Sequence, residues 1–181
     1  MEIMRIGDSA PEPLPAGDRP LSGIRVLDLT RVLAGPTCAR TLAEHGADVL
    51  RITGAHLPSL GYQELDTGHG KLSAELDLRA RGNVDILRGL VRKADVFSQG
   101  YRPGTLANRG LSPEELAAIR PGLVYVSLCA FSHAGPCGGC SFPGTPALTR
   151  RQRKIGAKED GDDHDENALH LPRRHLAAAA T

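Results

Sequence analysis

The sequence predicts an α/β fold of Rossmann type, an open and mostly parallel sheet with helical crossovers. Two observations predict it. Residues 24–51 consist of an apolar run of strand length, a segment of helical type and a second apolar run. The same alternation continues from residue 71 to about residue 128. Because two strands joined by a helical crossover lie parallel, these successive units predict a single parallel sheet.

The first unit begins with a strand at residues 24–29. Pro36 stands at an early position of the helix that follows, where its missing N–H costs nothing. Gly46 is expected to end that helix before a second strand at residues 47–52. Residues 53–70 hold several glycines and a proline, and we expect them to form a long loop, which in a compact domain is usually either functional or disordered.

The later elements are expected at residues 71–78 (strand), 80–93 (helix), 95–98 (strand), 112–119 (helix) and 123–128 (strand). In the strand at 71–78, alternation places Leu72 and Ala74 on one apolar side. Ser112 with Glu115 has the form of a capping box, which predicts the start of the helix there.

Composition divides the chain into three parts. Residues 1–20 contain four prolines and are expected to be a flexible lead-in, and residues 21–139 form the α/β domain. Residues 140–181 combine a basic run, an acidic run and a terminal alanine run without lasting apolar periodicity. This pattern predicts a low-structure tail, and we hypothesise that the tail arises from truncation or a frame shift.

Charge and cysteine content limit the kinds of partner and the cellular setting that we expect for this protein. The 181 residues carry 22 basic and 21 acidic side chains, a net charge of +1, so no global basic field attracts nucleic acid. Four cysteines and a polar start without signal-like character predict a reduced, cytoplasmic setting. No run approaches the roughly 18 apolar residues of a membrane span, so we expect no membrane partner.

In open parallel sheets, ligands bind beyond the carboxyl ends of the strands. Four loops meet that condition, and they are residues 30–35, the start of 53–70, residues 99–104 and residues 129–136.

Two motif interpretations fail at these loops. A P-loop needs a glycine at position 65 and Ser or Thr at position 72, but both positions hold leucine. A dinucleotide site needs three spaced glycines in the first turn, which has only Gly35.

Cys137 and Cys140 form one CxxC pair beside His133. A zinc site normally needs a second pair at suitable spacing, so we expect no metal. The basic run at 150–154 lies close to an acidic run and is interpreted as solvated tail rather than a nucleic-acid site.

An ordered set of short motifs resembles the family III CoA-transferases, which include formyl-CoA and carnitine CoA-transferases and, by fold, α-methylacyl-CoA racemase. The motifs are LSGIRVLDLTRVLAGP (21–36), GADV (46–49), GKLSAELDL (70–78), ADV (94–96), RPG (102–104), GL (110–111), PGLVYVS (121–127) and GP (135–136). The resemblance covers residues 21–139, and this is the N-terminal part of the family's large domain.

The resemblance implies CoA-binding roles for particular residues. The first loop would meet CoA, Lys71 would meet its phosphates, and Gly100 and Tyr101, after the strand at 95–98, would flank it. The implied set is Val32, Leu33, Ala34, Gly35, Gly70, Lys71, Gly100, Tyr101, Arg102, Arg109, Ala130 and Phe131. These types suit CoA, because its adenine needs a flat platform, its phosphates need cations and its thin arm needs glycines.

The implied activity is transfer of CoA from an acyl-CoA thioester to a small carboxylic acid, through intermediates on an aspartate, in an interlocked homodimer. The family's aspartate nucleophile has no counterpart in the matched residues, so no catalytic residue is assigned. The chain alone is therefore expected to be inactive. The alternatives are a non-catalytic remnant that binds CoA or a partner chain, and an acyl-CoA racemase-like protein.

Overall fold

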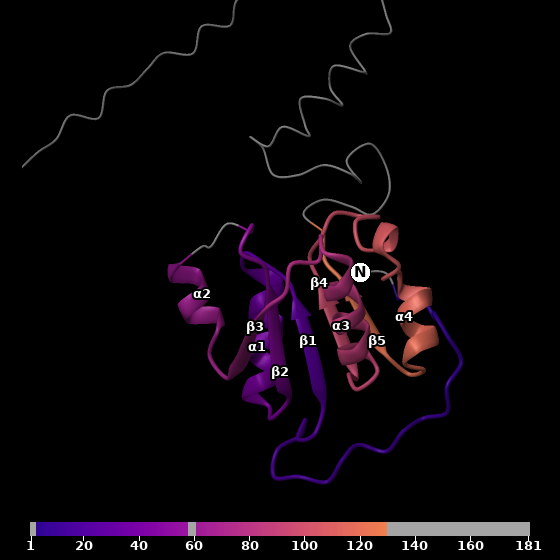
Figure 1. Ribbon diagram of the computed structural model, residues 1–181. Helices are drawn as coiled ribbons and strands as arrows, with labels where there is room; N and C mark the ends of the chain where they lie inside the picture. The colour runs from indigo at the N-terminus through magenta and orange to yellow at the C-terminus, as the bar shows by residue number, and fades with distance from the viewer. Residues whose placement is uncertain (1–2, 58–60, 130–181) are drawn as a thin grey trace, which may run out of the picture. The chain divides into compact units, whose positions relative to one another are not determined.

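The computed structural model describes residues 3–57 and 61–129, which form a sheet with helices on both faces (Figure 1). The strands are β1 (Arg25–Leu29), β2 (Asp48–Thr53), β3 (Lys71–Glu75), β4 (Val96–Gln99) and β5 (Val124–Ser127). The helices are α1 (Ala34–Glu44), α2 (Tyr62–Thr67), α3 (Arg81–Val91) and α4 (Pro113–Ile119), with a 3₁₀ turn, η1 (Ala107–Arg109).

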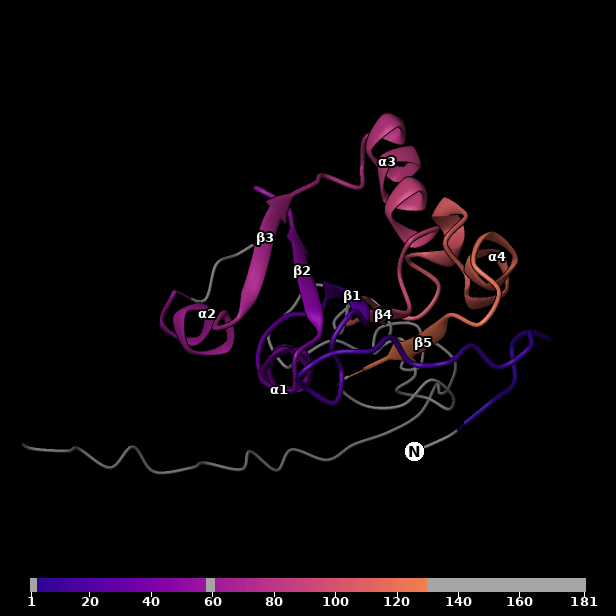
Figure 2. The same cartoon turned by 90° about the horizontal axis from the view of Figure 1, so that it is seen from below.

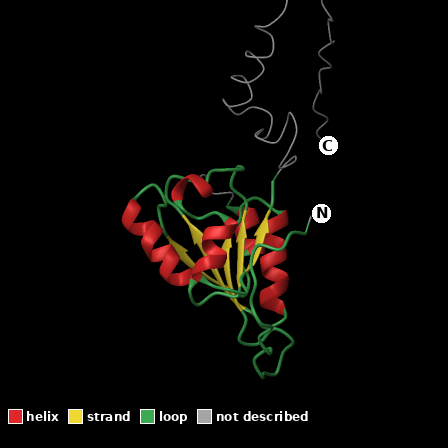
Figure 3. Ribbon diagram, turned by 90° about the vertical axis from the view of Figure 1, so that its right-hand side faces the viewer, coloured by secondary structure: helices red, strands yellow, loops and turns green. Residues whose placement is uncertain are grey.

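The sheet has the order β3-β2-β1-β4-β5, and every pairing is parallel. Figure 3 shows the strand arrows ending at a common edge. Leu27 of β1 lies between Leu50 of β2 and Phe97 of β4. After β3 the chain crosses to the other side of β1, so the order of strands reverses between β1 and β4. The predicted parallel α/β sheet with helical crossovers is confirmed.

Each face of the sheet has its own core. On the face of α1, Val26 and Val49 pack with Ala39 and Ala43 of the helix. On the opposite face, buried residues of α3 and α4 pack against the strands, and Figure 2 shows these two helices standing over the β4 and β5 side. The buried members of this larger cluster are Leu27, Leu29, Ile52, Leu78, Val84, Leu87, Val91, Ala94, Phe97, Leu106, Leu111, Leu116 and Leu123.

Two local expectations were wrong. The loop at 53–70 contains α2, whose Glu64 forms an ion pair with Arg51 of β2 at 2.9 Å, so a tertiary contact supports a helix that has little apolar periodicity. The third strand ends at Glu75, and its Leu72 is 72% exposed. The reason is the position of α3, which leaves this side of β3 without a covering helix among the described residues (Figure 2).

The lead-in has no helix or strand from residue 3 to residue 20. It nevertheless contacts the domain, since Arg19 packs against Gly46 and Glu12 accepts a hydrogen bond from Arg120 at 2.7 Å. Its flexibility stays a prediction.

The tail at 140–181, with Cys140 and the 150–154 run, lies outside the described residues, as does Cys137. Within residues 3–57 and 61–129, no helix has the length and apolar character to span a membrane.

Candidate functional site

The candidate site lies where the order of strands reverses, at the carboxyl ends of β1 and β4. Leu29 and Gln99 are paired at the ends of these two strands. The chain leaves β1 as the first loop, residues 30–33, and leaves β4 through Gly100. A Cβ added to Gly100 would lie 3.6 Å from Thr30 Cα, so the two loops are in close contact. Ligands of open α/β sheets bind at this kind of position.

The first loop has an unusual backbone. Val32 has φ +73°, a conformation that a β-branched residue rarely adopts. Its side chain and that of Leu33 are 46% and 54% exposed, so two apolar residues face solvent beside the sheet edge. At position 35 a Cβ would lie 2.3 Å from Thr30 Cβ, which is why α1 has glycine in its first turn. The positive φ of Val32 is a strained conformation, and such strain persists where the surrounding structure fixes the backbone of the loop.

A buried aspartate, Asp28, lies near the end of β1, next to the first loop. Asp28 is fully buried, and its Oδ2 lies 2.8 Å from Lys71 Nζ, whose side chain is 1% exposed. Lys71 Nζ also donates to the Pro36 carbonyl at 2.8 Å. The Oδ1 atom of Asp28 accepts the Thr30 N–H at 3.0 Å and the Thr30 hydroxyl. The buried carboxylate therefore has a cation and two hydrogen-bond donors.

The loop after β4 is fixed by Gln99, which is buried. Its amide nitrogen donates to Ser127 Oγ at the end of β5, and its oxygen accepts the Tyr101 N–H at 2.6 Å. Burial raises the pKa of Tyr101 above its usual 10.0, opposed by the nearby Arg31 and Arg109. The phenol of Tyr101 therefore stays protonated at neutral pH.

The structure brings together only part of the residue set that the resemblance implied. Val32 and Leu33 lie on the first loop, and Ala34 and Gly35 lie in the first turn of α1. Gly100, Tyr101 and Arg102 lie on the loop after β4, at the same carboxyl edge. Arg109 lies on η1 and donates to the Leu78 carbonyl. Gly70 and Lys71 lie at the amino end of β3, and a Cβ at Gly70 would contact Ala43 of α1 at 3.2 Å. Ala130 and Phe131 lie outside the described residues.

Sequence reasoning gave no role to Asp28 or Gln99. The signal for Asp28 was a single carboxylate inside the apolar run of the first strand, where an ionised group needs a partner. Gln99 ends β4 next to Gly100 and had no comparable signal, because its role depends on a hydrogen bond to Ser127 of the neighbouring β5.

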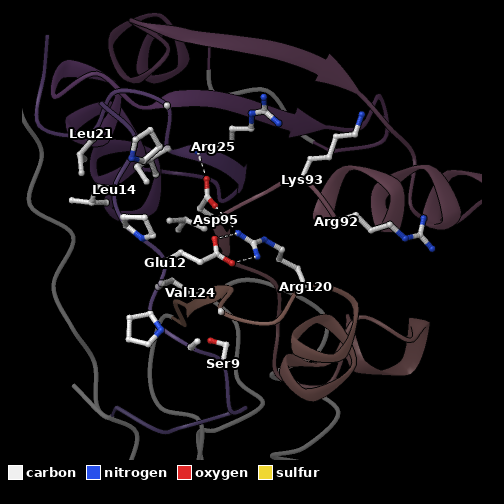
Figure 4. Close-up of a pocket in the computed structure, with 18 residues that line it drawn as sticks. Ser9, Glu12, Leu14, Leu21, Arg25, Arg92, Lys93, Asp95, Arg120 and Val124 are labelled. Atoms are coloured by element: carbon white, nitrogen blue, oxygen red, sulfur yellow. Dashed lines mark hydrogen bonds and ion pairs between the residues drawn. The ribbon is translucent and has the colours of Figure 1, made fainter. Parts of the chain in front are cut away.

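Hollows of very different size lie at the two edges of the sheet. A small cavity of about 10 Å³, lined by Thr30, Arg31, Val32, Pro36, Arg51, Glu64 and Thr67, has room for about one water molecule. A larger hollow of about 740 Å³ lies at the opposite edge, between residues 9–15 and the amino ends of β1, β4 and β5 (Figure 4). Across the described part of the chain, no three His, Cys, Asp or Glu side chains form a group suited to a metal ion.

Comparison with known proteins points to one family. Residues 21–145 match the model of "CoA-transferase family III". The chain is 35% identical over 143 residues to a succinate–glutarate CoA-transferase of Agrobacterium fabrum, covering 68% of this chain and 35% of the relative. It is 38% identical over 128 residues to an acetyl-CoA:oxalate CoA-transferase of Acetobacter aceti, covering 65% of this chain and 33% of the relative.

A solved structure agrees with these relatives. The crystal structure of Rv3272 from Mycobacterium tuberculosis superposes with a TM-score of 0.63 and 29% identity, covering 79% of this chain and 43% of that one. The chain spans about a third of the length of the two curated relatives. Because the family model matches more than half of the chain, this chain belongs to CoA-transferase family III.

Proposed function

We propose that this chain supplies the CoA-facing loops of an enzyme that transfers CoA from an acyl-CoA thioester to a small carboxylic acid. The observation that carries the proposal is the pair of touching loops at the strand reversal, where strained Val32 and its neighbour Leu33 expose apolar side chains. An exposed apolar pair on a fixed backbone suits the pantetheine arm or the adenine of CoA. The names of the two relatives pair CoA transfer with succinate, glutarate and oxalate, which are small carboxylic acids.

Within this proposal, the exposed backbone at Ala34 and Gly100 allows close approach of the CoA arm, and the buried Gly35 lets Thr30 pack against α1. Tyr101 offers an aromatic platform, and Arg102, which is exposed, offers a cation for a phosphate. Ala130 and Phe131 are proposed to add to the same surface from the segment after β5. Homodimeric assembly, which the family resemblance implies, and a cytoplasmic location, which the cysteine content favours, belong to the proposal as well.

Leu33 allows a direct test of the CoA surface, because Ile86 of α3 is a matched control. The two aliphatic side chains are 54% and 55% exposed, but Ile86 lies on a helix away from the first loop. We expect Leu33→Ala to weaken CoA binding in calorimetry roughly tenfold, the value of one buried aliphatic side chain. Ile86→Ala is expected to leave binding unchanged. Equal affinities of the two variants would refute this CoA surface.

A second function, CoA binding without transfer, is favoured by one observation. No aspartate among the described residues lies exposed at the two loops of the site. The carboxylate of Asp28, beneath these loops, is buried and already paired with Lys71. A transfer assay with labelled acyl-CoA separates the two functions. Transfer by the purified 181-residue chain would establish catalysis, whereas a heat of CoA binding without transfer would leave the binding role.

A further inference from the structure

Lys71 of β3 and Asp28 of β1 form an ion pair although they lie on different strands and in different rows of the sheet. Lys71 shares a row with Val49 of β2 and Val26 of β1, so it lies two residues below Asp28 along the strand direction. Two strand residues span about 7 Å. The lysine side chain therefore runs beneath α1, on the sheet face that the helix covers, and places its ammonium at the carboxyl end of β1.

The position of this ammonium makes it unsuited to a phosphate contact at the surface. Both side chains of the pair are essentially inaccessible to solvent, at 1% for Lys71 and 0% for Asp28. A buried charge without a partner is very unfavourable. If Lys71 moved out to meet an anion, the carboxylate of Asp28 would stay behind, buried and without its cation. The ion pair therefore holds Lys71 in place.

The pair is connected to both ends of the turn that contains the first loop. Asp28 Oδ1 accepts two hydrogen bonds from Thr30, at the start of the turn. Lys71 Nζ donates to the carbonyl of Pro36, in the first turn of α1. The strained Val32 lies between these two anchored points. A non-glycine residue keeps a positive φ where its surroundings over-determine the backbone, and these hydrogen bonds provide that constraint.

We propose that Asp28 and Lys71 are positioning residues, which fix the conformation of the first loop from below and do not themselves contact the ligand. The role of the loop in binding CoA rests on the function proposed above, but the control of loop conformation does not. This assignment replaces the direct phosphate contact that the family resemblance implied for Lys71.

Hydrogen exchange followed by mass spectrometry tests the control of the loop. The variants are Asp28→Asn, Lys71→Met and the double variant, with Lys93→Met as control because Lys93 is exposed after α3. We expect each single change, and also the double change, to speed exchange in residues 30–36 at least about tenfold, while exchange in β4 and α3 rises much less than in residues 30–36. Lys93→Met is expected to exchange like the unaltered chain.

The double variant keeps the test decisive if the single variants fail to fold. It removes both charges, so no uncompensated ion is buried, and replacing both members of a buried pair is often tolerated. A folded double variant with unaltered exchange in residues 30–36 would overturn the proposal. An equal rise of exchange throughout the sheet would also overturn it, since that is the response expected of a purely structural pair.

CoA titration of the same variants separates positioning from direct contact. If the pair positions the loop, both single variants lose affinity and the double variant loses no more than either. If Lys71 is itself a phosphate ligand, Lys71→Met loses affinity while Asp28→Asn, which frees the ammonium, does not, and the proposal is overturned. No heat with the unaltered chain would count against the proposed CoA function alone, because the exchange experiment decides the positioning role without a ligand.

Discussion

Glu12 and Arg120 are joined by two hydrogen bonds of 2.7 Å, although 108 residues separate them in the sequence. Arg120 also reaches Asp95 at 3.2 Å, and Asp95 accepts the backbone N–H of Arg25 at 2.9 Å (Figure 4). This chain of polar contacts connects the lead-in to the amino ends of β1, β4 and β5, at the border of the 740 Å³ hollow. The lead-in therefore has at least one defined point of attachment to the domain.

Glu12→Gln is predicted to release the lead-in without unfolding the domain. The amide lacks the charge that pairs with Arg120, and exposed ion pairs contribute little to global stability. Limited proteolysis of residues 3–20 should become faster, while the midpoint of urea unfolding stays unchanged. The neighbouring exposed pair offers a control, because Asp8→Asn removes the partner of Arg5 within the lead-in itself. Equal cleavage rates for Glu12→Gln and Asp8→Asn would contradict the prediction.

The same contact predicts a dependence on pH. Hydrogen bonding and charge attraction from Arg120 lower the pKa of Glu12 below its ordinary 4.5. A carboxyl group with a lowered pKa stabilises the contact above its ordinary pKa, and this contribution is lost as the pH falls through the lowered value. Cleavage of the lead-in by an acid-active protease should therefore accelerate below pH 4.5. In Glu12→Gln, cleavage should show no such additional acceleration.

Leu87→Ala is predicted to lower the free energy of unfolding by about 2–5 kcal/mol, the cost of a cavity at a fully buried leucine. Leu87 is 0% exposed in the core between α3 and the sheet. Ile86 is its neighbour on the same helix and is 55% exposed, so Ile86→Ala should cost less than about 1 kcal/mol. Urea denaturation measures both. Similar losses for the two variants would contradict the packing of α3.

Val32→Gly is predicted to weaken CoA binding without lowering the stability of the domain. Glycine adopts φ +73° without strain, and release of strain at such a site is worth about 1–3 kcal/mol, less the entropy that glycine adds to the unfolded chain. The free energy of unfolding should therefore stay constant or rise, while CoA affinity falls because the side chain is lost. The control is Val124→Gly in β5, where the same change should be destabilising. A loss of stability in both variants would contradict the strained backbone.

Ser112→Ala is predicted to lower the free energy of unfolding by about 1 kcal/mol through loss of the helix cap of α4. Ser112 Oγ accepts the Glu115 N–H at 3.2 Å, and Glu115 accepts the Ser112 N–H at 2.9 Å. Ser73→Ala, at an exposed position of β3, should cost less than about 0.5 kcal/mol. Chemical denaturation of both variants, with the helical signal followed by circular dichroism, provides the comparison.

Much of the local structure follows from short stretches of sequence. The capping box at Ser112 and the glycine stop at Gly46 both occur where the sequence predicts them. The parallel pairing of the strands also follows, because a helical crossover allows little else. The position of the candidate site at the carboxyl ends of the strands could be predicted for the same reason. The ordered motifs added the family, which the match over residues 21–145 confirms.

The order of the strands and the contact of Lys71 with Asp28 were decided by the tertiary structure. Lys71 meets Asp28 because two strands separated by β2 are in a particular register and α1 covers both side chains. Likewise, α2 and the positive φ of Val32 depend on contacts with distant residues. Periodicity and capping are local properties that a sequence displays directly. A buried ion pair between residues 43 positions apart exists only once folding has removed both charges from water and brought them together.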